Sequence, residues 1–302
     1  MAGSTTPAPR LMLGLIVGLA AAGIGALYTV FARWGIARGM ASPDLTVLRY
    51  GTAGLITLPL LFKALWSDFD AMVQQWRVWA LVALLAGTPF GLLMFGALQL
   101  APASHAAIFP FAAMSVMGML LSTWILGEPF TKRRLAGISI VMAGLVLLSG
   151  VIDSAFSAKA LLGDLMFVAA GTLWAGFGIV LRRHKLEPIL ATAVISFSAL
   201  LTYVPVYLLM GRGAQLLATQ PQVLIVEVLV QGLIAGAGTL YTYAKMVSLL
   251  GAARAAIFPA LAPGMAALLA WPILGHVPSI PETVGLSIAM FGLLIAVTQK
   301  QS

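Results

Sequence analysis

The chain has 302 residues and is dominated by apolar side chains. Hydrophobic residues make up 61% and charged residues 9%, and 17 Lys and Arg against 9 Asp and Glu give a net charge of +8. Because a soluble domain carries roughly 25% charged residues, this composition excludes an ordinary soluble protein and indicates an integral membrane protein. The absence of cysteine excludes disulfides, thiolate catalysis and cysteine-based metal sites.

Apolar segments long enough to cross a bilayer follow one another along nearly the whole chain. The predicted spans are residues 11–33, 44–62, 78–99, 102–126, 135–152, 161–181, 189–210, 222–245, 254–274 and 282–298. The first is longer than the roughly 7–15 apolar residues of a signal peptide, so we expect a retained helix. The sequence therefore predicts an all-α integral membrane protein with ten transmembrane helices.

The basic residues lie in short clusters between these spans, as residues that set membrane topology do. Alternate loops hold most of them: Arg10, Lys63, Arg77, Lys132, Arg133, Arg134, Arg182, Arg183, Lys185, Lys245 and Lys300. The opposite side holds Arg33, Arg38, Lys159 and Arg212. Because cytoplasmic loops carry the excess of Lys and Arg, both termini are predicted to be cytoplasmic, and nucleic-acid binding is not expected.

The segment 63–77 separates the second and third spans. Its apolar residues Trp66, Phe69, Val73 and Trp76 recur every three or four positions. This spacing is typical of a short amphipathic helix lying in the membrane interface. An ordinary loop with interfacial aromatic residues is the alternative.

The chain contains an internal duplication. The five residues AAIFP occur at 106–110 and again at 255–259, and GISIVMAGLVL from Gly137 corresponds to GLSIAMFGLLI from Gly285. The offset is 148 or 149 residues, about half the chain. A repeat of this length indicates two homologous halves.

We therefore predict one transmembrane unit made of two repeats, residues 1–152 and 153–302. Each repeat holds five predicted spans, and because five is odd, the second repeat enters the membrane from the opposite side. Inverted repeats of this kind are typical of secondary transporters that work by alternating access. Duplication that serves only packing is the alternative.

The repeated passages resemble those of the EamA family in the drug/metabolite transporter superfamily. Both copies, 106–148 and 255–297, contain a small-residue helix with a proline, then ILG, a turn and a closing glycine-containing helix. The first copy has Glu128 after ILG, as the family does, whereas the second has His276. Arg49 matches an arginine that family members often carry early in their second helix.

The resemblance implies a secondary transporter for small organic metabolites in the bacterial inner (plasma) membrane. The overall similarity favours the branch of bacterial aromatic amino-acid exporters, so we expect amino acids with aromatic or other apolar side chains as cargo, moved outward. Two alternatives remain: a transporter of drugs or nucleotide sugars, and a non-transporting receptor or scaffold. The expected partners are a small-molecule substrate and the lipid bilayer, with the oligomeric state left open.

No enzymatic activity is expected, because the sequence has no phosphate-binding loop, zinc-protease motif or nucleophile elbow. We also expect no cofactor or metal.

The candidate substrate-binding residues are those placed at cavity depth in the predicted helices. They are Tyr28, Arg49, Tyr50, Phe90, His105, Phe109, Trp174, Phe177, Tyr203, Tyr241, Tyr243 and Arg254. Aromatic rings offer stacking area with little loss of conformational freedom, although each ring could equally serve packing. A charge as deep as that of Arg49 should find a partner or water, and Asp44 faces away from it on an ideal helix.

His105 and Arg254 each precede one AAIFP copy. They are candidates for a carboxylate-attracting pair at the two mouths of a cavity. The alternative is that both side chains reach toward lipid headgroups.

Glu227 is interpreted as the acid lying well inside a predicted span, and Gln231 follows it by one turn. It is the candidate coupling acid if transport is coupled to protons. A solvated anchor near the outer surface is the alternative.

Proline interrupts several predicted helices because it lacks a backbone donor. Pro89, Pro110, Pro205, Pro259 and Pro263 are candidate bends that widen a central cavity. Kinks that serve only packing are the alternative.

The predicted orientation can be tested in this cysteine-free chain. The variant Ser157→Cys should react with an impermeant thiol reagent added outside intact cells, because the loop after the fifth span is predicted to be external. Thr131→Cys should not react. The opposite labelling pattern would overturn the orientation.

Overall fold

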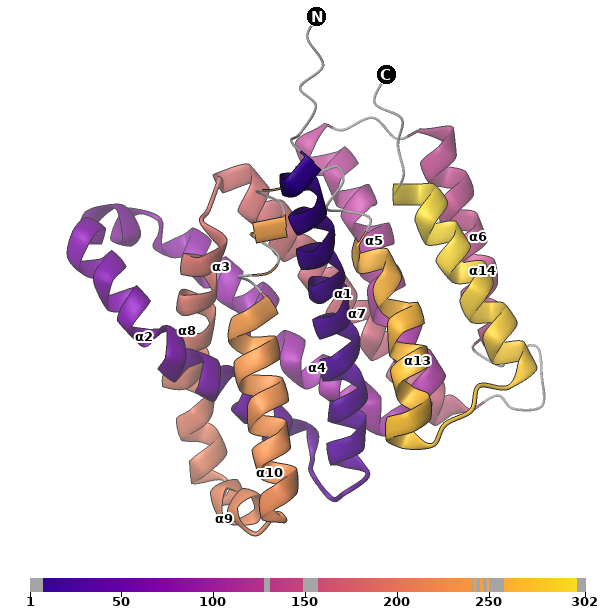
Figure 1. Cartoon of the computed structure of the whole chain (residues 1–302). Helices are drawn as coiled ribbons and strands as arrows, with labels where there is room; N and C mark the ends of the chain where they lie inside the picture. Colours follow the sequence, from indigo (N-terminus) through magenta and orange to yellow (C-terminus); the bar gives the residue numbers. More distant parts are fainter. Residues whose placement is uncertain are drawn as a thin grey trace, which may run out of the picture.

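The structure is a computed structural model that describes residues 8–127, 131–148, 157–239, 242, 245–246, 249 and 258–297. Over these ranges the regular structure is entirely helical, which confirms the all-α prediction. Long helices lie side by side in one bundle (Figure 1).

The first half of the chain forms six helices in the described ranges. They are α1 (Ala8–Ile36), α2 (Ser42–Gln74), α3 (Trp76–Ala86), α4 (Thr88–Leu100), α5 (Ala103–Leu126) and α6 (Lys132–Leu148). The second half contains α7 (Ala158–His184), α8 (Pro188–Leu209), α9 (Arg212–Leu217), α10 (Pro221–Glu227), the π-helix η1 (Val228–Gly238), the 3-10 turn η2 (Phe258–Leu261), α13 (Ala262–Leu274) and α14 (Ile280–Val297).

Each of the ten predicted spans overlaps helix in the described residues, with a break at Gly87 in the third. Within the described ranges, seven helical segments are long and apolar enough to cross a membrane, and α13 and α14 are shorter apolar helices. The start of α6 carries three basic residues. The chain is thus a multi-pass membrane protein, and the number of ten crossings stays a prediction.

Two predicted helices are interrupted in the structure. The span 78–99 is divided into α3 and α4 at Gly87, and Pro89 lies in the first turn of α4. The span 222–245 begins as the α-helix α10 and continues as η1. A π-helix has a wider backbone turn and is frequent at functional sites. The segment η1 is therefore a candidate part of the functional site.

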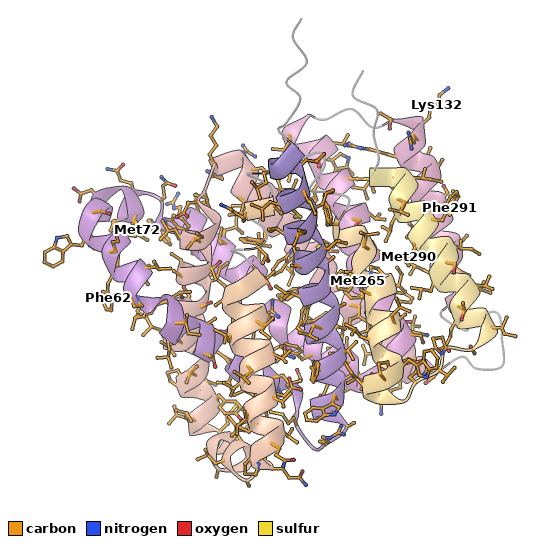
Figure 2. The ribbon with its side chains drawn as sticks, in the orientation of Figure 1. Phe62, Met72, Lys132, Met265, Met290 and Phe291 are labelled. Atoms are coloured by element: carbon orange, nitrogen blue, oxygen red, sulfur yellow. The ribbon has the colours of Figure 1, made fainter. Side chains whose placement is uncertain are left out.

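The segment 63–77 is neither a loop nor a separate helix. The helix α2 continues without a break to Gln74 and extends outward at the left of Figure 1. Trp66 is 95% exposed, and Phe62, Phe69 and Trp76 are also exposed. The predicted amphipathic helix is therefore present as an extension of α2, and Figure 2 shows Phe62 on its outer surface.

The start of α1, the start of α6 and the end of α14 lie together at one end of the bundle. Lys132, at the start of α6, lies at the end where α1 begins and α14 ends (Figure 2). The helices α1 and α14 thus have their terminal ends on one side of the bundle, as the predicted orientation requires.

Helices α6 and α14 occupy equivalent positions in the two halves and pack against each other through glycine. A Cβ atom placed on Gly144 would lie 2.6 Å from the backbone nitrogen of Ala289. A Cβ placed on Gly292 would lie 2.6 Å from the backbone nitrogen of Val141. Because the two contacts are reciprocal at the repeat offset, the helices run antiparallel with their backbones in close contact.

Other helix pairs show the same reciprocity. In the two repeats, α5 is equivalent to α13, α7 to α1, α3 to η1 and α8 to α2. The contact between α5 and α7 accordingly has its counterpart between α13 and α1. The contact between α3 and α8 has its counterpart between η1 and α2. Such a pattern is what a two-fold axis in the membrane plane produces, and it supports inversion of the second repeat. The boundary at residue 152 lies outside the described residues and stays a prediction.

The two AAIFP prolines do not have equivalent backbone surroundings. Pro110 lies inside the continuous helix α5, whereas Pro259 lies in η2. Pro263 follows in the first turn of α13, and Pro205 lies inside α8. Equivalent positions in the repeat thus do not give the two prolines equivalent backbone structure, and their role as bends that widen a cavity stays a prediction.

Gly144→Ala and Gly292→Ala should each destabilise the protein by about 1–3 kcal/mol, because the added methyl group meets backbone atoms that cannot move away alone. Both variants should lower the melting temperature in detergent. Gly178→Ala is the matched control, since a Cβ at Gly178 meets no atom within 4 Å. Equal melting temperatures for all three variants would contradict the close α6 and α14 contact.

Candidate functional site

Arg49 is a buried cation in the interior of the bundle. Its residue is 4% exposed, and its guanidinium carbon lies 4.7 Å from the ring centre of Tyr28 and 5.9 Å from that of Phe90. Such rings attract a cation through their electron-rich faces. Nη1 is buried without a hydrogen-bond partner among the described residues, so Arg49 retains capacity to bind an anion.

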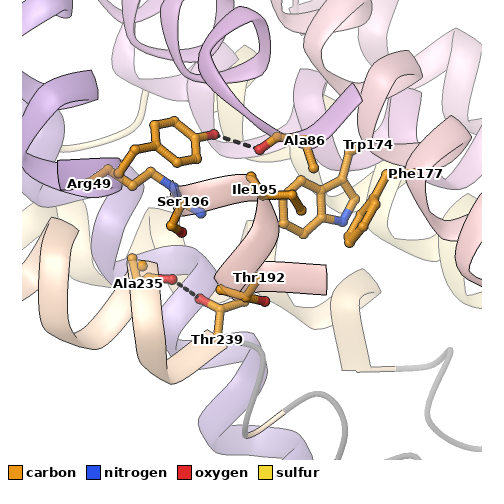
Figure 3. Close-up of a pocket in the computed structure, with 11 residues that line it drawn as sticks. Arg49, Ala86, Trp174, Phe177, Thr192, Ile195, Ser196, Ala235 and Thr239 are labelled. Carbon is orange, nitrogen blue, oxygen red and sulfur yellow. Dashed lines mark hydrogen bonds between the residues drawn. The ribbon is translucent and has the colours of Figure 1, made fainter. Parts of the chain in front are cut away.

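A small cavity adjoins Arg49 and is lined by both halves of the chain. The first half contributes Arg49, Tyr50 and Ala86, and the second contributes Trp174, Phe177, Thr192, Ile195, Ser196, Ala235, Gly236 and Thr239. Figure 3 shows the Arg49 side chain extending toward Ser196, with the Trp174 and Phe177 rings forming another part of the wall. The cavity therefore combines one cation, hydroxyl groups and aromatic surface.

The helix break at Gly87 contributes to this wall. Interruption of the helix frees the carbonyl of Ala86, and the Tyr50 hydroxyl donates a 2.7 Å hydrogen bond to it (Figure 3). A freed carbonyl in a membrane interior needs such a partner. Tyr50 thus stabilises the break and forms part of the cavity wall.

Small residues bring the second-half helices close to α2 at Arg49. A Cβ on Gly236 would lie 2.8 Å from the Arg49 carbonyl oxygen, and one on Gly54 would lie 3.0 Å from the Ser196 carbonyl oxygen. These glycines allow the backbones of η1 and α8 to contact α2 directly. Arg49 is consequently held at the junction of the two halves.

The cavity beside Arg49 is small in this conformation. Its volume is about 30 Å³, which is enough for about two water molecules. An amino acid is several times larger, so the helices must separate before a metabolite can bind here.

His105 and Phe109 are not part of this cavity. Nδ1 of His105 lies 2.9 and 3.1 Å from the two carboxylate oxygens of Asp164, and both residues are buried. Phe109 stacks on the His105 ring at 5.4 Å. His105 therefore joins α5 to α7, and the alternative that its side chain reaches toward lipid headgroups is wrong. Its role in a carboxylate-attracting pair with Arg254 stays a prediction.

Asp164 was missed because it follows the start of its predicted span by only one turn. Glu227 was interpreted as the acid well inside a span, yet Asp164 is also buried in α7. The available signal was an acid within an apolar segment, which demands a partner. Its distance of 59 residues from His105 concealed which partner it has.

Tyr203 also lies away from the cavity. Its hydroxyl donates to the Pro43 carbonyl at 3.2 Å, near the start of α2. Tyr207, which the sequence did not single out, donates to Asp44 Oδ1 at 2.7 Å, and Arg212 Nη2 lies 3.3 Å from the same oxygen. Asp44 is thus engaged with α8 and α9, consistent with its expected failure to pair with Arg49.

Glu227 is completely buried, so its interpretation as a solvated anchor is wrong. Its Oε2 accepts a 3.0 Å hydrogen bond from Nε2 of Gln231, and this pair packs against α1. Burial of both residues follows from the approach of η1 to α1 and α2.

Three residues that the sequence suggests for the site, Tyr241, Tyr243 and Arg254, lie outside the described residues, as does Glu128. Of the others, Arg49, Tyr50, Trp174 and Phe177 line the cavity, and Tyr28 and Phe90 contact Arg49. The hydroxyl-bearing residues Thr192, Ser196 and Thr239 were not predicted as lining. Within the described part of the chain, no three His, Asp or Glu side chains gather as a metal site.

These features define a multi-pass helical membrane protein with a small cavity between two repeats. The model of the EamA-like transporter family matches the chain twice, over residues 12–150 and 161–298, and the chain belongs to this family. The fold is similar to that of a protein of known crystal structure with a TM-score of 0.62 and 19% identity, covering 94% of this chain and 96% of that one. No curated protein sequence matches the chain significantly.

The buried His105 and Asp164 pair predicts strongly non-additive substitutions. Asp164→Leu alone should destabilise the protein by about 3–5 kcal/mol, because it leaves His105 buried without its partner. The double variant His105→Leu with Asp164→Leu should recover much of this loss. Melting temperatures that fall additively in the two single variants and the double variant would contradict the pairing.

Proposed function

We propose that the chain is a secondary transporter that moves small organic metabolites carrying a carboxylate, above all amino acids with aromatic or other apolar side chains. It works by alternating access as an exporter in the bacterial inner membrane, with both termini in the cytoplasm. The family assignment supports transport in general. The carboxylate and the apolar side chain are inferred from the cavity.

The observation that carries this proposal is the buried guanidinium of Arg49. Arginine binds carboxylates through two parallel hydrogen bonds, and Nη1 has no partner among the described residues. The rings of Tyr28 and Phe90 hold the group without consuming its hydrogen bonds. Arg49 is therefore held in place and available to a ligand carboxylate.

The rest of the lining fits the remaining groups of an amino acid. Trp174 and Phe177 lie 5.5 Å apart with their rings edge to face, and they offer a surface for an apolar or aromatic side chain. The Thr239 hydroxyl donates to the Ala235 carbonyl at 2.6 Å, so its oxygen can accept from an α-amino group. Ser196 supplies a second hydroxyl in the lining.

The residues that line the cavity argue against a nucleotide sugar, the alternative cargo that carries several negative charges. Arg49 is the only cation among the described lining residues, whereas a nucleotide sugar calls for several cationic contacts. The experiments below distinguish the proposal from the two remaining alternatives, a transporter of neutral drugs and a non-transporting receptor.

Purified protein in liposomes should transport labelled phenylalanine and leucine. Arg49→Gln should weaken phenylalanine binding by about 30-fold or more, because a buried charged hydrogen-bonding partner is lost. Phenylalanine should raise the melting temperature of the wild type by mass action, and phenylalanine amide, which lacks the carboxylate, should not.

Arg38→Gln is the matched control, since Arg38 is exposed and lies over the Trp34 ring. Equal stabilisation by phenylalanine and its amide would refute the role of Arg49. Ligand-induced stabilisation without flux would favour a receptor, and absence of flux for a broad panel of amino acids and metabolites would refute transport.

A further inference from the structure

Glu227 is an acid in the membrane interior that the substrate cavity does not use. It is the last residue of α10, directly before η1, and its exposed fraction is 0%. The surrounding segment Pro221–Gly238 is apolar enough to span a membrane. Placing an acid in the membrane interior is costly, and residues of this kind usually have a function.

The carboxyl group of Glu227 lies in a space that α1 leaves open at a glycine. A Cβ placed on Gly35 would lie 2.6 Å from Glu227 Oε1, so no other residue type fits there without displacing the acid. Glu227 belongs to the second repeat and Gly35 to the first. The acid therefore lies at the contact between the two repeats.

One neutral group donates to this carboxyl. Gln231 Nε2 lies 2.9 Å from the Tyr28 carbonyl oxygen and 3.0 Å from Glu227 Oε2. Because the Tyr28 carbonyl can only accept, it fixes the orientation of the Gln231 amide with Nε2 toward both oxygens. Glu227 Oε1 has no hydrogen-bond partner among the described residues.

The cations of α1 near this position are engaged elsewhere. Arg33 donates to the Leu98 and Ala101 carbonyls at the end of α4. Arg38 lies 4.0 Å over the Trp34 ring. Neither forms an ion pair with Glu227.

The charged groups of α2 that face η1 and its surroundings form no ion pair with Glu227 either. Arg49 lies over the Tyr28 ring, and Asp44 accepts from Tyr207 and Arg212. Of the ion pairs between described residues, none includes Glu227. A carboxylate here would be a buried charge without a cationic partner among the described residues, which is costly, whereas the neutral acid avoids this cost.

We propose that Glu227 is the proton-binding residue of the transport cycle, protonated while α1 and η1 are packed together and ionised when their separation admits water. The proton comes from the solution on one side of the membrane and leaves to the solution on the other. This proposal rests on the proposed transport function and adds its coupling ion.

Tyr28 provides a physical connection between the proton site and the substrate site. Its ring contacts the Arg49 guanidinium, and its carbonyl accepts from Gln231, which binds Glu227. A shift of α1 that opens the cavity at Arg49 therefore also disturbs the hydrogen bond that holds Gln231. Substrate access and release of the Glu227 proton are in this way coupled through one residue.

The first experiment uses no substrate and is therefore independent of the transport proposal. If the folded wild type holds an extra proton at Glu227, its melting temperature in detergent should fall as the pH rises from about 6 to about 9, since the unfolded state binds fewer protons over this range. Glu227→Gln resembles the protonated acid and should show a clearly smaller fall. Glu282→Gln, at a partly exposed acid that faces His276 at 3.5 Å, should behave as the wild type.

Identical pH dependence in Glu227→Gln and the wild type would overturn the proposal. Failure of Glu227→Gln to fold would also overturn it, because glutamine has the shape and neutrality of the protonated acid.

The second experiment measures phenylalanine flux in liposomes with an imposed pH gradient. The wild-type flux should change by about tenfold or more with the gradient, and that of Glu227→Gln by less than about twofold, with exchange of labelled for unlabelled phenylalanine retained. Asp164→Asn tests the other buried titratable pair. Gradient dependence that survives in Glu227→Gln but is lost in Asp164→Asn would assign the proton to His105 and Asp164 and refute the role of Glu227.

Discussion

The close antiparallel contact between α6 and α14 relates the two halves of the molecule. Gly144 meets the Ala289 backbone as Gly292 meets that of Val141, so one interface is formed twice by equivalent residues. Lipid supplies no hydrophobic driving force between helices, and close packing at small residues replaces it. The other helix pairs repeat this reciprocity, and the contact between the halves continues into the bundle interior.

The polar residues at the contact between the halves depart from the symmetry of the backbone. At the offset of 148 residues, Arg49 corresponds to Phe197, Glu227 to Trp79 and Asp164 to Ile16. Duplicated helices therefore provide a nearly symmetric framework, and single substitutions within it place one cation and one uncompensated acid on different sides of Tyr28. In the proposals above, the cation that binds substrate therefore belongs to the first half and the acid that binds the proton to the second, although residues of both halves line the cavity.

Much of the fold and part of the site follow from local patterns. Apolar length predicted the long helices, and four of the candidates chosen from the sequence, Arg49, Tyr50, Trp174 and Phe177, line the cavity. Interruption of the span 222–245 by a π-helix was not predictable, because i to i+5 hydrogen bonding leaves no periodic signal in so apolar a segment. The burial of Glu227 was misjudged for a related reason: sequence position measures depth along a helix, not which neighbour covers it.

The duplicated segments and the apolar runs of the chain are sufficient for an all-helical membrane protein of two repeats, because bilayer thickness and the need to satisfy backbone hydrogen bonds leave few other solutions. Which polar groups meet is a different matter. The contacts of His105 with Asp164 and of Gln231 with Tyr28 join residues 59 and 203 positions apart. Such contacts arise from the crossing of helices at particular small residues, and that geometry exists only once the helices have packed.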